Sequence, residues 1–196
     1  MKNKKSIGIL GRGFVGDIIA RYYSLQDPKC YDISEALDSD PLEEVLRCDI
    51  IFIAFNLKDN AISGTEPIEN YLRQESFVKP GTTFIIKSTF VPGTTDKLQE
   101  KYPQYNIVYS PEFLTEATAW DDFTKPQFQI LGMPHKTLEL ANELFELLPP
   151  APVRRIISPL DAEILKHAQN TYYALKVTWF NQLYDACAKL GGDYET

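Results

Sequence analysis

Residues 5–16, which read KSIGILGRGFVG, decide the fold. An apolar run of strand length meets a G-x-G-x-x-G spacing, and apolar residues at helical spacing follow at once. This order of strand, glycine turn and helix begins a dinucleotide-binding βαβ unit. In such a unit Gly11 forms the tight turn, Gly13 lets the backbone approach a pyrophosphate, and Gly16 lets the helix pack closely on the strand.

The first helical residues, Phe14 and Val15, are expected beside the cofactor phosphates, because a helix N-terminus carries free N–H groups and a positive dipole end. Asp32 follows Gly11 by 21 positions and ends a short strand at residues 29–31. A carboxylate at that position accepts the ribose hydroxyls of NAD and repels the 2′-phosphate of NADP. The alternative is an ordinary glycine turn with a surface aspartate.

The composition excludes several classes of protein. A net charge of -7 argues against a nucleic-acid or anionic-membrane surface. No apolar run approaches the 18 or so residues that span a bilayer, and glycines break the N-terminal apolar stretch before it could act as a signal peptide. The cysteines, Cys30, Cys48 and Cys187, are odd in number and lack metal-ligand spacing. They indicate reduced thiols of a cytoplasmic protein and no metal site.

Strand and helix patterns alternate along the whole chain. Strands are expected at residues 49–55, 82–87, 106–109, 128–131 and 153–157, and helices at 41–47, 66–74, 94–101, 134–148 and 159–190. Pro41 is expected at a first helical position with Asp40 as its cap. This alternation predicts a Rossmann-type, doubly wound, mostly parallel sheet over residues 1–157, followed by a long C-terminal helix over residues 158–196.

Ligands of such sheets bind beyond the carboxyl ends of the strands, so the polar segments after Phe55, Lys87 and Tyr109 are expected to carry the chemistry. Residues 56–64 are expected to border the cofactor.

Candidate catalytic groups stand at these places and on the long helix. Lys166 and Asn170 are four positions apart on one helix face and can stabilise an oxyanion. Ser88 and Thr89 offer hydroxyls after a strand, and Glu112 and Glu116 offer carboxylates for acid–base work. The alternatives are a solvated helix face for the first pair and capping groups for the others.

Taken together, four segments resemble the UDP-glucose/GDP-mannose dehydrogenase family, specifically its N-terminal NAD-binding domain. The segments are residues 11–16, 87–95 (KSTFVPGTT), 110–119 (SPEFLTEATA) and 162–170 (AEILKHAQN) with Asn181. The resemblance implies NAD as cofactor and oxidation of the C6 alcohol of a nucleotide sugar to a carboxylate.

By this resemblance Lys166 and Asn170 stabilise the oxyanion, and Thr89 and Glu112 serve the catalytic water and the acid–base steps. Ser88, Thr89 and Glu116 are expected on the cofactor side of the site. Asp32 matches the acid that binds the adenosine ribose. The family's long helix contributes to a dimer core, which implies a homodimer here.

The sequence also departs from the family. The catalytic cysteine and the C-terminal domain that holds the nucleotide are absent from these residues, the segment 33–48 is short, and Phe55-Asn56-Leu57 replaces a Gly-Thr-Pro loop. The family's Asn-Glu pair appears as Asn181-Gln182. The chain is therefore expected not to complete the oxidation alone.

Two other functions stay open. A short β-hydroxyacid-type dehydrogenase also pairs a Rossmann domain with a Lys-x-x-x-Asn helix and needs no cysteine. A non-catalytic NAD-binding or regulatory module would keep the fold and associate through the long helix. Apolar residues expected on the surface of that helix favour association; they are Leu165, Tyr172, Leu175, Trp179 and Leu183.

Overall fold

The computed structural model describes residues 5–34, 36–55 and 65–194. Within them, the strands form one sheet in the order β2-β1-β3-β4-β5-β6-β7. The strands are β1 (Ile7–Leu10), β2 (Lys29–Tyr31), β3 (Ile50–Ile53), β4 (Thr83–Ile86), β5 (Asn106–Tyr109), β6 (Phe128–Gly132) and β7 (Val153–Ile157). Neighbouring strands are parallel except β5 and β6, which are antiparallel with Tyr109 opposite Gly132. The expected mostly parallel, Rossmann-type sheet is therefore confirmed.

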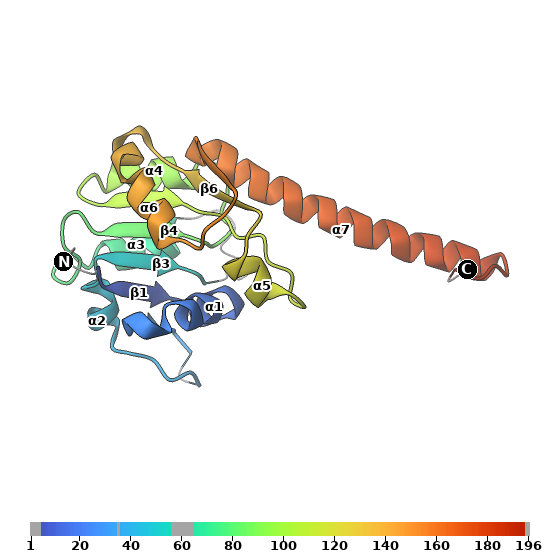
Figure 1. The fold of residues 1–196 in the computed structure, drawn as a ribbon, viewed down its shortest axis with the longest axis horizontal. Coiled ribbons are helices and arrows are strands. Elements are labelled where there is room, and N and C mark those ends of the chain that lie inside the picture. Colours follow the sequence, from blue (N-terminus) through green and yellow to red (C-terminus); the bar gives the residue numbers. More distant parts are fainter. Residues whose placement is uncertain (1–4, 35, 56–64, 195–196) are drawn as a thin grey trace.

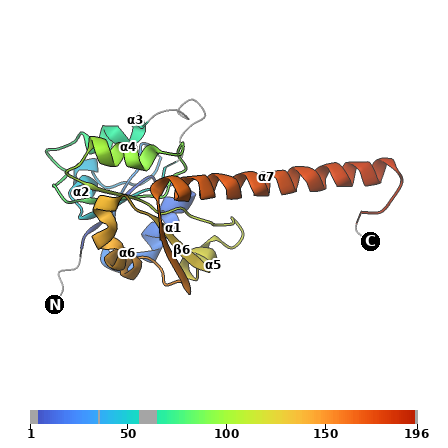
Figure 2. The same ribbon diagram turned by 90° about the horizontal axis from the view of Figure 1, so that it is seen from above.

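Helices cover both faces of the sheet (Figure 1). The α-helices are α1 (Phe14–Tyr22), α2 (Leu42–Leu46), α3 (Glu66–Leu72), α4 (Thr94–Lys101), α5 (Ala119–Thr124), α6 (Ala141–Leu147) and α7 (Pro159–Lys189). Short 3-10 helices are η1 (Ser24–Gln26) and η3 (His135–Leu140). Figure 2 shows α2, α3 and α4 on one face of the sheet and α1, α5 and α6 on the other.

Each central strand contributes to two cores because its side chains alternate between the faces. On β3, Ile51 and Ile53 belong to the core under α2, α3 and α4. Phe52, between them, belongs to the core under α1, α5 and α6. All four residues of β1, β3 and β4 are buried, as continuous apolar runs of a parallel sheet predict.

One expected helix start was wrong, and one expected helix is divided in two. Pro41 is the N-cap of α2 and lies before its first helical residue. Asp40 does not cap that helix, since its carboxylate accepts the backbone N–H of Cys30 at 2.8 Å and fastens the loop to β2. The expected helix at 134–148 is divided into η3 and α6, because its first turns adopt the tighter 3-10 geometry.

The turn between β1 and α1 has the glycine requirements that the motif predicted. Gly11 has a φ of 101°, and a Cβ there would lie 2.7 Å from the Phe55 nitrogen. A Cβ on Gly16 would lie 1.8 Å from the Gly11 carbonyl oxygen, whereas a Cβ on Gly13 would meet no atom of the described residues within 4 Å. Gly11 and Gly16 are therefore needed for the fold, and the described residues leave space for a side chain at Gly13.

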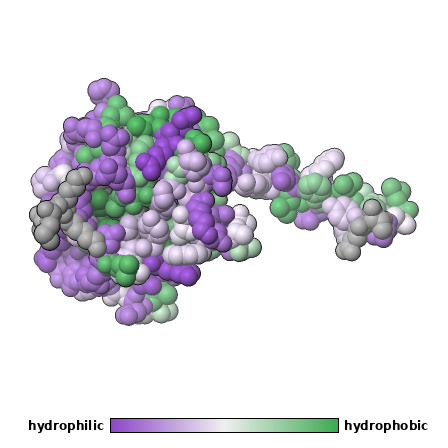
Figure 3. Space-filling model, viewed as in Figure 1, coloured by the Kyte–Doolittle hydropathy of each residue, from purple (hydrophilic) through white to green (hydrophobic). Residues whose placement is uncertain are grey.

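The long helix α7 begins against the sheet and then leaves it. Ser158 caps its N-terminus by accepting the Asp161 N–H at 3.1 Å, and Pro159 occupies the first turn. Ala162, Glu163 and Lys166 are buried, whereas residues 170–186 are all exposed. Figure 1 shows this part projecting from the body, and Figure 3 shows apolar residues along it. No helix in the described residues is long and apolar enough to cross a membrane.

The two glycines at 13 and 16 give a matched test of the turn. Gly16→Ala is expected to reduce the free energy of unfolding by about 3 kcal/mol or more, because its methyl group overlaps the Gly11 carbonyl. Gly13→Ala is expected to change it by no more than about 1 kcal/mol, since its surroundings are open. Urea unfolding of the two variants measures both values. Similar losses in the two variants would contradict the described turn.

Candidate active site

The glycine turn presents a backbone surface suited to phosphate. Gly13 is the N-cap of α1, and no side chain among the described residues caps that end. The first N–H groups of the helix are therefore free for an anion. Phe14 is exposed, and Val15 is half-buried against the core. The predicted residues Gly11, Gly13, Phe14, Val15 and Gly16 thus lie together at the carboxyl end of β1.

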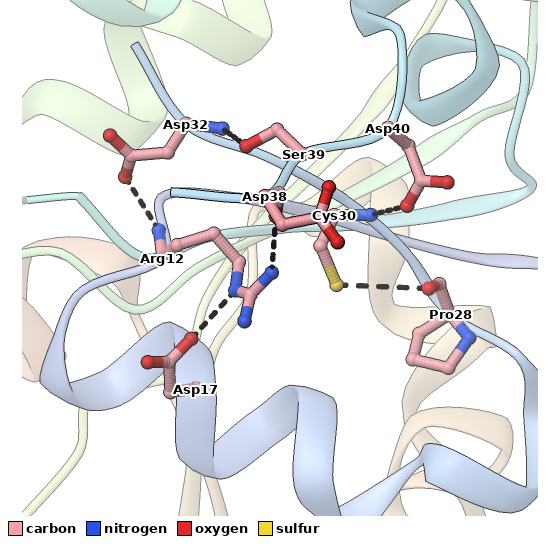
Figure 4. Close-up of polar contacts among 8 residues, drawn as sticks. All are labelled: Arg12, Asp17, Pro28, Cys30, Asp32, Asp38, Ser39 and Asp40. Atoms are coloured by element: carbon pink, nitrogen blue, oxygen red, sulfur yellow. Dashed lines mark hydrogen bonds and ion pairs between the residues drawn. The ribbon is translucent and has the colours of Figure 1, made fainter. Parts of the chain in front are cut away.

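Asp32 lies beside this turn, directly after β2, with its carboxylate fixed by the backbone (Figure 4). Its Oδ2 accepts the Arg12 N–H at 2.7 Å, and its Oδ1 accepts the Ser34 N–H at 2.8 Å. Each carboxylate oxygen has a further lone pair for a hydroxyl donor. The free N–H groups of the turn could hold a phosphate and the Asp32 carboxylate could accept hydroxyl groups, and the two lie at the ends of adjacent strands.

Arg12, which the sequence reasoning passed over, holds the loop after β2 in place. Its Nε donates to Asp17 Oδ1 of α1 at 2.6 Å and its Nη1 donates to the Asp38 carbonyl at 2.9 Å. The hydrogen bond with Asp17 raises the pKa of Arg12 further above its ordinary value. The arginine therefore fastens the short loop to the first turn of α1 (Figure 4). Its position within the glycine motif was the only available signal.

The end of β4 places Lys87, Ser88 and Thr89 in three different settings. Ser88 Oγ donates to the Phe55 carbonyl at 2.7 Å, which joins the ends of β3 and β4. Thr89 is half-buried. Lys87 is 4% exposed and donates from Nζ to Ser110 Oγ at 2.8 Å. Burial lowers the pKa of Lys87 to about 8, the Glu112 carboxylate opposes that decrease, and Lys166 adds to it. The expected residues 56–64 lie outside the described part of the chain.

Lys166 and Glu112 form the central contact of the site. The Lys166 Nζ donates both to the Glu112 carbonyl and to Glu112 Oε1, each at 2.6 Å. Glu112 Oε2 accepts the Leu114 N–H at 2.8 Å, so each carboxylate oxygen has a donor. The structure therefore brings together two of the residues that the sequence singled out, one from the segment after β5 and one from α7.

Asn170 and Glu116 are exposed, and neither is among the residues that line the cavity beside this contact. The residues of α7 that line the adjacent cavity are Gln169 and Tyr173. Asn170 is one turn beyond Lys166, but the helix has by then left the sheet, so its environment differs from that of Lys166. The sequence spacing predicted that Lys166 and Asn170 share one face of the helix, but it could not show where α7 departs from the body of the protein.

A cavity of about 210 Å³ opens beside the Lys166–Glu112 contact. It is lined from different elements by Lys87, Glu112, Phe113, Gln129, Gln169 and Tyr173, among others. None of the cysteines lines it. Burial raises the pKa of the Cys30 thiol and raises that of Cys48 to about 11, which makes both poor nucleophiles.

Glu163 and His167 fix α7 over the site, and the sequence gave no role to either. The buried Glu163 carboxylate accepts the Gly93 N–H at 2.5 Å and the Thr95 N–H at 2.9 Å. His167 Nε2 lies 2.7 Å from the Phe90 carbonyl, which can only accept, so this nitrogen carries the proton. Their partners lie about 70 positions earlier in the chain, and no local pattern reveals such a pairing.

Comparison with known proteins points to one family of dehydrogenases. The sequence matches the UDP-glucose/GDP-mannose dehydrogenase family, NAD binding domain, over residues 34–148. UDP-glucose 6-dehydrogenase of Rickettsia conorii is 26% identical over 177 residues, which are 82% of this chain and 40% of that protein. GDP-mannose 6-dehydrogenase of Pseudomonas putida is 26% identical over 172 residues, 79% of this chain and 39% of that protein. The chain thus spans less than half the length of these relatives.

Solved structures show the same fold. A ternary complex of GDP-mannose dehydrogenase from Pseudomonas aeruginosa has a TM-score of 0.75 and 22% identity, covering 95% of this chain and 54% of that one. UDP-glucose dehydrogenase from Pyrobaculum islandicum has a TM-score of 0.77 and 21% identity, covering 97% of this chain and 55% of that one. With more than half of its residues matched to the family, the chain belongs to the UDP-glucose/GDP-mannose dehydrogenase family, in the part that forms the NAD binding domain.

Proposed function

We propose that the chain binds NAD at the β1–α1 turn and serves the oxidation of the C6 alcohol of a nucleotide sugar, with UDP-glucose as the substrate to test. The observation that carries the proposal is the buried Lys166–Glu112 contact, at 2.6 Å, at the same edge of the sheet as the glycine turn. Ligands of doubly wound sheets bind at that edge.

The chain's own residues divide the proposed work between them. The α1 N-terminus and Gly13 hold the pyrophosphate, and Asp32 accepts the adenosine ribose hydroxyls and excludes a 2′-phosphate. Bound NAD supplies the hydride acceptor. Lys166 provides a buried positive charge where an alkoxide develops, and Glu112 provides a carboxylate that can take a proton.

The family match favours this substrate class over a small β-hydroxy acid. The matched residues include the segments 87–95 and 110–116, which a β-hydroxyacid dehydrogenase does not require. The proposal is limited to cofactor binding and the first oxidation, because no cysteine lines the cavity beside Glu112. Sustained formation of two NADH per UDP-glucose by these residues alone would contradict this limit.

NAD binding is testable on the purified chain by calorimetric titration. NAD is expected to bind at least about tenfold more tightly than NADP, because the Asp32 carboxylate repels a 2′-phosphate. Asp32→Ala is expected to weaken NAD binding about tenfold or more, since it removes charged hydrogen-bond acceptors.

Asp38→Ala is the matched control. It removes a carboxylate from the same loop, but the Arg12 contact uses the Asp38 backbone carbonyl and is retained. This variant is expected to bind NAD like the parent chain. Absence of NAD binding by the parent chain, or equal binding of NAD and NADP, would reject the proposal.

We also propose that two copies of the chain associate through α7, with the exposed apolar face as the contact. Its residues fall on adjacent rows of the helix, one at Tyr172, Leu175, Trp179 and Leu183 and the other at Tyr173, Val177, Phe180 and Tyr184. Their exposed fractions run from 44% to 64%, which is unusual for large apolar side chains on one surface. A second copy supplies an equal and complementary face, as a twofold interface requires.

Trp179→Asp is expected to increase the dimer dissociation constant at least about tenfold, because it places a charge in the centre of the apolar face. Gln182→Asp introduces the same charge beside that face and is expected to have little effect. Analytical ultracentrifugation over a range of concentrations compares the two. A parent chain that stays monomeric at high concentration would contradict the association.

A further inference from the structure

Lys87 is a buried cation without an acidic partner. Its Nζ donates to the neutral Ser110 hydroxyl, and within the described ranges no carboxylate lies at ion-pair distance from it. An ammonium group has three donors, so this one keeps capacity for further acceptors. Taking a lysine out of water without a counter-ion is costly, and such residues are usually paired.

The other charged side chains that line the cavity have polar partners of their own. Glu112 is paired with Lys166 at 2.6 Å, so their charges offset one another. The Asp122 carboxylate accepts the Thr115 N–H at 3.0 Å and the Thr118 hydroxyl at 2.8 Å within its own segment. At the surface, Lys125 pairs with Asp121 at 3.1 Å. Lys87 is therefore the cation of the cavity wall that no carboxylate of the described residues contacts directly.

The cavity itself suits a small polar ligand. Its volume of about 210 Å³ holds about seven water-sized groups. Amide and hydroxyl side chains of Gln127, Gln129, Gln169 and Tyr173 contribute to its walls, beside the rings of Phe113 and Phe128. A ligand with a carboxylate at one end and hydroxyls near it matches both the cation and the amides.

We propose that Lys87 makes this cavity a carboxylate site, in which the ammonium group pairs with a small hydroxy-carboxylate and discriminates it from the corresponding alcohol. The identity of the natural ligand rests on the proposed function, because a C6 carboxylate is the product of the complete oxidation whose first step is proposed for these residues. The ionic contact itself depends only on the cavity. Lys87 is then the residue that distinguishes the C6 carboxylate of the product from the C6 alcohol of the substrate.

The site has a defined dependence on pH. Carboxylate binding needs the proton on Lys87, whose pKa burial lowers to about 8, with Glu112 and Lys166 acting in opposite directions. A bound carboxylate stabilises the charged form and raises this pKa. Affinity is therefore full below pH 8 and falls as the pH rises through it. Tyr173, Asp122 and Lys125 are the other ionisable groups of the cavity wall.

Protection from acetylation tests the proposal directly. Acetic anhydride reacts with the deprotonated amine, forming the N–C bond with loss of acetate and a proton, and peptide mass spectrometry measures the rate at each lysine. At pH 8, glycolate is expected to slow acetylation of Lys87 at least threefold. Ethylene glycol, its alcohol counterpart, and sodium chloride at equal ionic strength are expected to have no such effect. Lys125, on the same wall but paired with Asp121, is the internal control.

Two variants test how the neighbouring charges act on Lys87. Glu112→Gln removes the carboxylate that opposes the decrease in the Lys87 pKa, so the pH at which protection by glycolate is lost is expected to shift downward, provided that circular dichroism shows a folded chain. Lys166→Met removes the cation that adds to this decrease, and the same pH is expected to shift upward. Equal protection by glycolate and sodium chloride, or no acetylation of Lys87 at any pH, would overturn the proposal. Protection by glycolate in a chain that binds no NAD would reject the proposed function and leave the carboxylate site intact.

Discussion

The site depends on one buried interaction, between the Glu163 carboxylate and the start of α4. Glu163 is fully buried and accepts three hydrogen bonds, from the Gly93 N–H and from the N–H and hydroxyl of Thr95. The N-terminus of a helix favours a negative charge, so the N–H groups at the start of α4 stabilise the buried carboxylate in place of water. The contact fixes the first turns of α7 over the sheet, and Lys166, one turn later, is thereby held against Glu112.

The two buried lysines beside the sheet differ in how far their neighbours stabilise the positive charge. The Lys166 ammonium has the Glu112 carboxylate and carbonyl as partners, and Ser110 provides Lys87 with one neutral acceptor. A buried pair costs desolvation and is retained when its geometry is good. The lone lysine has only a partial compensation, which is why its pKa decreases while the charge of Glu112 limits the decrease. A buried, partly compensated charge such as Lys87 would destabilise a core that binds no ligand. Its presence beside the cavity therefore favours a ligand there.

The sequence predicted most of the scaffold because its signals were local. Apolar runs gave β1, β3, β4 and β5, and the glycine spacing gave the turn that Gly11 and Gly16 require. It also gave Lys166 and Glu112 as separate candidates. It could not give their contact, the burial of Lys87 or the anchoring by Glu163, because each depends on residues brought together from distant strands and α7. The division of 134–148 into η3 and α6 was missed because η3 spans only His135–Leu140, too few residues for a repeat of 3.0 to be told from one of 3.6.

The family match and the cofactor turn are independent of one another. The matched residues begin at position 34, after the glycine turn and after Asp32. The turn therefore stands on its own geometry, in which a methyl group at Gly16 would overlap the Gly11 carbonyl, whereas one at Gly13 would meet no atom of the described residues within 4 Å. A purely structural turn needs the first property and gains nothing from the second. Among the described residues, packing therefore explains the glycines at positions 11 and 16, and it does not by itself call for glycine at position 13, which lies at the uncapped start of α1.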